Sequence, residues 1–105
     1  MIGAVGTGGG GGVDIGAQSY IEHLQSEGVE TDGVLVKEDV STGTAVILVE
    51  EGTGENRILI TAGANGAIRR GELRLREGEG GVVMFQLEIP IEIVRMPLFL
   101  VEMGR

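Results

Sequence analysis

The pattern of apolar and polar positions divides the first part of the chain into a strand, a helix and a second strand. Short apolar runs at Ile2–Val5 and Val34–Val36 predict the two strands. Asp14 stands at the N-cap position of the intervening helix, and Gly28 stands where a left-handed residue would end it. Apolar residues between them recur at helical spacing, at Ala17, Tyr20, Ile21 and Leu24. This order is typical of α/β proteins.

The strongest local signal is a β-hairpin within Val40–Asn65. Its two runs, Thr44–Val49 and Arg57–Thr61, are rich in Val, Ile, Leu and Thr, which favour strands. The polar connector Glu50–Asn56 contains two glycines, which supply the backbone freedom that a turn requires. The glycine-rich stretch Gly63–Ala67, which follows the hairpin, is expected to form a loop.

The second half of the chain is less regular. Val82–Phe85 is a continuous apolar run bounded by glycine, and this pattern predicts a central strand buried on both faces. Pro90 suits the first turn of a helix through Ile91–Val94. The charged stretch Ile68–Gly80 fits either a short helix or a strand, and the pattern does not choose between them.

Composition narrows the function classes. The 105 residues suffice for one domain with a modest core. A formal net charge of −8 and 3% aromatic residues argue against nucleic-acid binding and against an anionic membrane surface. There is no cysteine, so disulfides and thiolate chemistry are excluded, and a reducing compartment fits. With no signal-peptide pattern and no apolar run long enough to cross a bilayer, we expect a cytoplasmic chain, with the nucleus as a second compartment.

The glycine tract Gly6–Gly12 has two interpretations. Its glycines match the spacing G-x-G-x-x-G between a strand and a helix, which in dinucleotide folds brings backbone N–H groups to a phosphate. However, a run of glycines matches any glycine motif, and Asp14 would add a negative charge beside the phosphate. A mobile connector is the favoured interpretation. A small βαβ nucleotide-binding domain that uses this tract is the alternative.

Few residues present candidate chemistry. His23 lies on the polar side of the predicted helix and is interpreted as a surface residue. Glu50, Glu51 and Glu55 cluster in the hairpin connector, where solvation explains them. Glu88 follows the predicted buried strand, and ligands of open α/β sheets bind at the carboxyl ends of strands. Glu88 is therefore either a sugar-hydroxyl acceptor or a solvated loop carboxylate.

Several ordered segments resemble ribokinases, within the PfkB-type carbohydrate kinase family. The segments are Ser41–Ile47, the Gly52-x-Gly54-Glu55-Asn56 connector, Gly63–Asn65, the helix and turn Tyr20–Gly33, and Met84–Glu88 followed by Pro90. The resemblance implies a ribokinase-like three-layer α/β sandwich, to which the hairpin contributes part of a small β lid. It implies a partial kinase domain over residues 1–94 and an unmatched tail over residues 95–105.

The resemblance also implies a chemistry. The family uses ATP and Mg²⁺ to phosphorylate ribose or a similar sugar, and Glu88 matches a carboxylate that hydrogen-bonds the sugar. The family's sugar-binding Asp and Gly-Gly motif would precede Met1. Its Asn-x-x-Glu motif and its Gly-Ala-Gly-Asp loop, which carries the catalytic base, would follow Val94. We therefore expect a ribokinase-like fragment that is inactive alone, because nothing places Asp14, Asp32 or Asp39 beside a phosphate as a base.

A second class of function is a non-catalytic binding module. A fragment of a larger sheet leaves strand edges unpaired, and such edges favour pairing with another chain. Association of identical copies through the exposed edges of the hairpin is therefore the alternative expectation.

Overall fold

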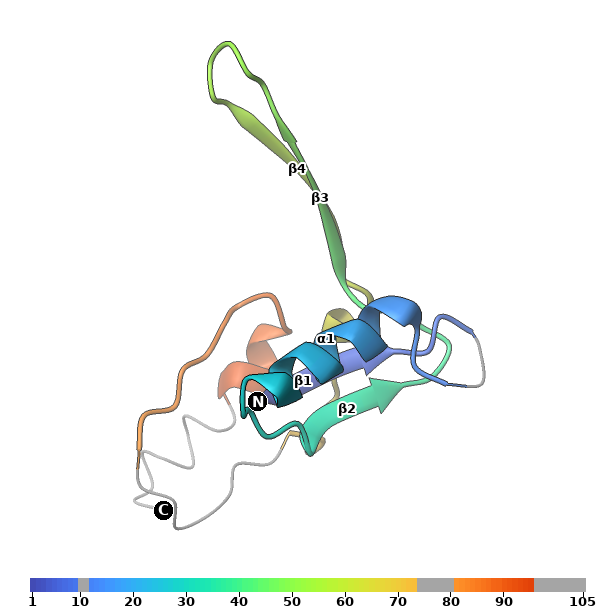
Figure 1. The fold of residues 1–105 in the computed structure, drawn as a ribbon. Coiled ribbons are helices and arrows are strands. Elements are labelled where there is room, and N and C mark those ends of the chain that lie inside the picture. Colours follow the sequence, from blue (N-terminus) through green and yellow to red (C-terminus); the bar gives the residue numbers. More distant parts are fainter. Residues whose placement is uncertain (10–11, 74–80, 96–105) are drawn as a thin grey trace.

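The computed structural model describes residues 1–9, 12–73 and 81–95, and it contains two separate two-stranded sheets. Strand β1 (Ile2–Gly6) pairs in parallel with β2 (Gly33–Lys37), and helix α1 (Ile15–Ser26) connects them. Strands β3 (Thr44–Val49) and β4 (Asn56–Thr61) form an antiparallel hairpin. The hairpin projects away from the rest of the molecule, which we call the body (Figure 1). Sheet and helix thus mix as predicted for an α/β protein.

Helix α1 begins and ends where its sequence predicts. The Asp14 carboxylate accepts a hydrogen bond of 2.8 Å from the Ala17 N–H, which satisfies a free amide of the first turn. Gly28 has a φ of 77°, and the Val29 N–H donates to the Leu24 carbonyl at 3.0 Å. These bonds close the last turn of the helix.

The apolar side of α1 is narrower than predicted. Ala17 is fully buried, while Ile21 and Leu24 are half-buried. Tyr20 was expected on the same stripe, but it is 56% exposed. The expectation is wrong for Tyr20 because its ring lines an open cavity, whereas Ala17 is fully enclosed.

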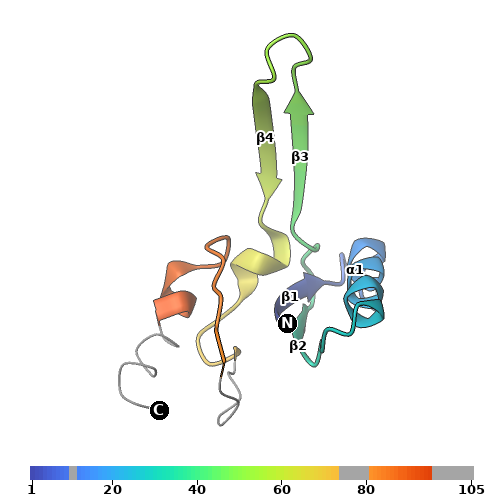
Figure 2. The same cartoon turned by 60° about the vertical axis from the view of Figure 1, so that its left-hand side comes forward.

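The core lies on the other side of the β1–β2 sheet. Ala4 of β1 packs there in one cluster with Ala64, Ile68 and Ile93. Residues 91–95 are helical, as the Pro90 pattern predicted, and the Ile93 N–H donates to the Pro90 carbonyl at 2.9 Å. Helix α1 and residues 91–95 lie on opposite sides of the sheet (Figure 2). The body therefore has three layers, with helix, sheet and helix in that order.

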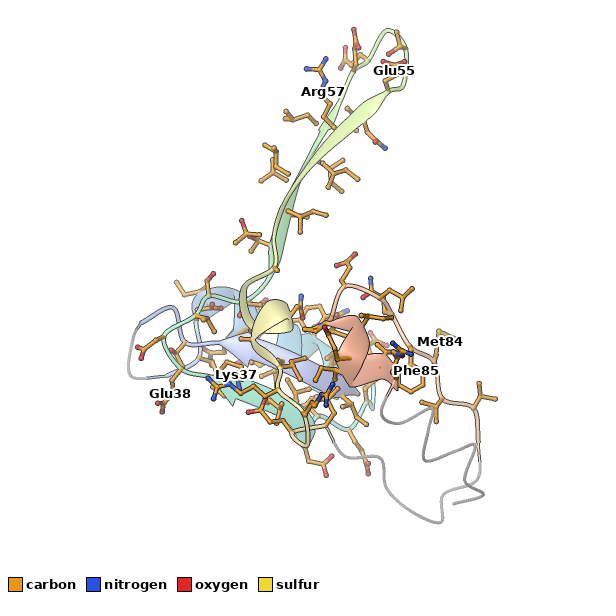
Figure 3. The ribbon with its side chains drawn as sticks, turned by 180° about the vertical axis from the view of Figure 1, so that it is seen from behind. Lys37, Glu38, Glu55, Arg57, Met84 and Phe85 are labelled. Atoms are coloured by element: carbon orange, nitrogen blue, oxygen red, sulfur yellow. The ribbon has the colours of Figure 1, made fainter. Side chains whose placement is uncertain are left out.

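The predicted buried strand at Val82–Phe85 does not form. These residues have neither helical nor strand structure, and Val82 and Met84 are 94% and 91% exposed. Figure 3 shows Met84 and Phe85 on the stretch that leads to the helical residues 91–95. A continuous apolar run becomes a central strand only between two neighbouring strands. Within the described residues, β1 pairs with β2 and no third strand joins this sheet.

Two other segments also differ from expectation. Gly63–Ala67 forms a 3-10 helix, η1, instead of an irregular loop, since Ala64 is buried in the core. Residues 68–73 are neither helix nor strand, and residues 74–80 lie outside the described part, as do residues 96–105 of the predicted tail. A salt bridge of 2.7 Å between Lys37 and Glu72 ties the end of β2 to this segment.

The glycine tract is hydrogen-bonded at its start. The Thr7 N–H donates to the Lys37 carbonyl at 3.1 Å, and the Gly8 N–H donates to the Val40 carbonyl at 2.9 Å. These bonds tie the start of the tract to the chain that follows β2. The mobile connector stays a prediction. Residues 10–11 lie outside the described part. Among the described residues, no helix has the length and apolarity to cross a membrane.

Candidate functional site

The hairpin carries apolar side chains on both faces. Cross-strand partners share a face, and the register pairs Ile47 with Ile58 and Val46 with Leu59. The first face, which we call the aliphatic face, consists of Ala45, Ile47, Val49, Ile58 and Ile60, with Asn56 at its end. The opposite face is mixed and consists of Thr44, Val46, Leu48, Arg57, Leu59 and Thr61. Every residue of both strands is exposed, so the hairpin presents apolar side chains on its surface.

An open cavity of about 850 Å³ lies between the base of the hairpin, the carboxyl end of β1 and the start of α1. Its lining includes Val5, Asp14, Tyr20, Thr42, Thr44 and Asn65. The carboxyl ends of parallel strands are the usual ligand-binding edge of open α/β sheets. The cavity thus lies where open α/β sheets usually bind their ligands.

Asp14 is the carboxylate that lines this cavity, and its hydrogen bonds stabilise its ionised form. Its Oδ2 accepts a hydrogen bond of 2.8 Å from the Thr42 N–H, and its Oδ1 accepts from the Ala17 N–H at 2.8 Å and the Thr42 hydroxyl at 2.9 Å. The Thr42 and Ala17 N–H groups lower the pKa of Asp14 below its ordinary value. The group is therefore a carboxylate near neutral pH.

This arrangement argues against a phosphate cradle at the glycine tract. A phosphate at a helix N-terminus needs free backbone amides and the absence of competing negative charge. Here the Asp14 carboxylate already binds the Ala17 amide and carries the charge itself. The first turn of α1 is occupied by its own cap.

Glu88, the predicted sugar-binding residue, lies elsewhere. It is exposed, within a turn at residues 87–89, and its N–H donates to the Gln86 Oε1 at 2.8 Å. It is not among the residues that line the cavity. The structure thus leaves the sugar contact of Glu88 as a prediction and does not bring this residue to Asp14.

The other candidates lie apart from the cavity. His23 is exposed on α1, and the glutamates of the hairpin connector are exposed at the far end of the hairpin, where Figure 3 labels Glu55 and Arg57. Within residues 1–9, 12–73 and 81–95, no three His, Cys, Asp or Glu side chains gather where they could hold a metal ion. The described residues therefore offer no cluster of this kind, and no step through a metal follows from them.

The link between Asp14 and Thr42 was not found from the sequence. Asp14 shows a capping pattern, which is local, but its bonds to Thr42 join residues 28 positions apart. The Ser41-Thr42-Gly43 segment before the hairpin is a weak signal, because a small polar segment suits any loop.

Comparison with known proteins identifies the family. Residues 2–79 match the family of pfkB carbohydrate kinases. A ribokinase of Schizosaccharomyces pombe is 39% identical over 101 residues, which are 93% of this chain and 30% of the ribokinase. The chain therefore spans under a third of the length of that relative.

Solved structures of ribokinases also resemble this chain. A ribokinase of Cryptococcus neoformans var. grubii serotype A, determined in complex with ADP, is 28% identical with a TM-score of 0.62 over 93% of this chain and 28% of its own. A ribokinase of Giardia lamblia is 32% identical with a TM-score of 0.51 over 68% of this chain and 19% of its own. By its sequence and by its fold, this chain belongs to the pfkB family of carbohydrate kinases.

Proposed function

We propose that this chain is the sugar-covering part of a ribokinase-type kinase and binds a ribose-like sugar without phosphorylating it. The observation that carries the proposal is the similarity to ribokinases over 93% of the chain, in sequence and in fold. The exposed hairpin corresponds to a lid that covers the sugar. The exposed Glu88 carboxylate is available to accept hydrogen bonds from sugar hydroxyls.

The proposal separates sugar binding from catalysis. The 105 residues contain neither an Asn-x-x-Glu motif nor a Gly-Ala-Gly-Asp loop. Phosphoryl transfer needs a metal, positioned donors and an oriented nucleophile. ATP and Mg²⁺ would serve a complete kinase of this type, which makes ribose 5-phosphate, and the present chain supplies part of the sugar site. The absence of cysteine fits a cytoplasmic location, and the net charge of −8 argues against nucleic-acid partners.

Titration with ribose, followed by amide chemical shifts in NMR spectra, tests the sugar contact. We expect weak binding by the unmodified chain and at least a roughly tenfold loss of affinity in Glu88→Ala, because a charge-assisted hydrogen bond contributes about 1.5–3 kcal/mol. Glu92→Ala is the matched control, since Glu92 is an exposed carboxylate on the adjacent helical residues. Equal ribose affinity in all three proteins would exclude the role of Glu88.

An assay with ATP, Mg²⁺ and ribose tests the catalytic part separately. We expect product at the background level, with or without the Glu88→Ala change. Turnover clearly above background that is lost on heat denaturation would show that the chain is a complete catalyst, and the fragment interpretation would then be wrong.

A second candidate function is self-association through the hairpin. It is favoured by the aliphatic face, whose side chains are exposed, with Ile47 57% and Ile60 63% exposed. A second copy would cover this face or pair with the outer edge of β3 or β4. Sedimentation without ligand would then show dimers that dissociate in Ile47→Lys. A monomer at all concentrations would rule out this function.

A further inference from the structure

The base of the hairpin is tied to the body by a small polar network, which we call the root network. It consists of the Asp14 carboxylate, the Thr42 N–H and hydroxyl, and the Gly6 N–H. Thr42 donates twice to Asp14, at 2.8 and 2.9 Å, and its hydroxyl accepts from the Gly6 N–H at 3.0 Å. The network thus joins the end of β1, the start of α1 and the loop that enters β3.

The chain around this network is closely packed. A Cβ on Gly6 would overlap the Val40 carbonyl oxygen, and a Cβ on Gly63 would overlap the Ser41 carbonyl oxygen. The Ala64 N–H donates to the same Ser41 oxygen at 2.8 Å, which ties the chain that leaves β4 to the chain that enters β3. Both ends of the hairpin therefore meet the body beside Asp14.

The strands themselves do little to hold the hairpin in place. All twelve residues of β3 and β4 are exposed, so packing along their length cannot set the direction of the hairpin. The direction must come from contacts at the base. The Asp14 carboxylate is the charged member of these contacts, and charge-assisted hydrogen bonds are stronger than neutral ones.

We propose that Asp14 is a positioning residue that fixes the direction of the hairpin relative to the body through its two bonds to Thr42. This role differs from helix capping, which uses only the bond to the Ala17 N–H. It also does not depend on the proposed sugar binding, since the root network consists only of groups of the chain itself. The low pKa of Asp14 supports the proposal, because the carboxylate stays an acceptor near neutral pH.

Two variants separate positioning from capping. Asp14→Ser keeps a side chain that caps helices about as well as aspartate, but it is too short to reach both Ala17 and Thr42. Thr42→Val removes the hydroxyl and leaves the cap untouched, and Thr42→Ser restores the hydroxyl. Thr44→Val makes the same chemical change two residues further on, where the structure gives no side-chain hydrogen bond, and serves as the control.

The measurement is the distance distribution between spin labels on the hairpin connector and on α1. The chain has no cysteine, so Glu51→Cys and Ser19→Cys provide unique exposed attachment points. We expect one narrow distribution in the parent and in Thr42→Ser and Thr44→Val. Asp14→Ser and Thr42→Val should broaden it at least about twofold, with unchanged helix content by far-ultraviolet circular dichroism.

The proposal would be overturned by a native distribution in Asp14→Ser, which would make Asp14 a helix cap only. It would equally be overturned if Thr42→Ser were as broad as Thr42→Val, since the hydroxyl would then be irrelevant. Loss of helix content in Asp14→Ser with a native distribution in Thr42→Val would likewise assign Asp14 to capping and contradict the positioning role.

Discussion

The body and the hairpin are stabilised in opposite ways. The body buries small and medium side chains between layers, and Ala64, Ile68 and Ile93 are at most 5% exposed. No residue of the hairpin strands is buried, and along their length the strands are held by cross-strand pairs and backbone hydrogen bonds. An isolated two-stranded hairpin is marginally stable in water. We therefore expect the two regions to respond differently to the same kind of mutation.

The largest expected effect on the free energy of unfolding comes from a substitution at the junction of the two regions. In Gly6→Val the new side chain would overlap the backbone of the chain between β2 and β3, which cannot move without breaking the root network. We expect a loss of roughly 4 kcal/mol or more in the free energy of unfolding, at the high end for single substitutions.

Urea denaturation measures this loss, and Gly3→Val in the same strand is the matched control. A Cβ at Gly3 would meet no atom within 4 Å. A similar loss in both variants would show that strand β1 tolerates no side chain at either position, and the packing argument at Gly6 would be wrong.

A smaller loss of unfolding free energy is expected for a truncation in the core, and a smaller one still for the same truncation in the hairpin. Ile68 is 4% exposed, so Ile68→Ala removes buried methyl groups and leaves a cavity, which costs about 3 kcal/mol. Ile60→Ala makes the same chemical change on the aliphatic face, where the side chain is 63% exposed, and should cost less than about 0.5 kcal/mol. Urea titrations of dilute samples compare the two. Equal losses would mean that the aliphatic face is covered in solution, which would favour self-association.

The smallest expected effect is the pH dependence of the stability that the root network contributes. The pKa of Asp14 is lowered in the folded chain by the Thr42 and Ala17 N–H groups, so its stabilisation is complete above its unfolded pKa of about 3.9. The stabilisation is lost as pH falls through the lower, folded pKa. Lys37 and the Arg69 N–H lower the pKa of Glu72 in the same direction.

Thermal melts between pH 6 and pH 3 measure this dependence. The melting temperature of the parent should fall with pH, and Asp14→Asn should remove a few degrees of that fall because asparagine does not titrate in this range. Parallel curves for parent and variant would show that Asp14 contributes nothing to the acid sensitivity, and Glu72→Gln would then be the variant to compare.

The sequence was sufficient where the determining contacts are local. Helix α1 has its cap, its apolar spacing and its terminal glycine within fifteen residues, and the hairpin has two strand-forming runs with a turn between them. The α/β class and the ribokinase resemblance also followed from the order of these segments. Both are confirmed by the fold and by the family match.

The sequence was insufficient where contacts between residues far apart in the chain determine the structure. Val82–Phe85 has the composition of a buried strand, but burial depends on neighbouring strands, which a run of residues does not encode. The root network needs the return of the chain after β2 to bring Thr42 to Asp14. The role of Glu88 and the domain limits at residues 94 and 95 stay predictions, since no contact in the structure tests them.

The register of the two sheets has a consequence for the order of folding. The hairpin joins residues that are close in the chain, and such hairpins form in about 1–10 μs. The parallel sheet pairs Ile2 with Gly33, so it must wait for the intervening helix and for a long loop to close. The hairpin, although only marginally stable on its own, can therefore form the aliphatic face before the body exists. In a refolding chain this apolar surface would face the solvent from the earliest steps.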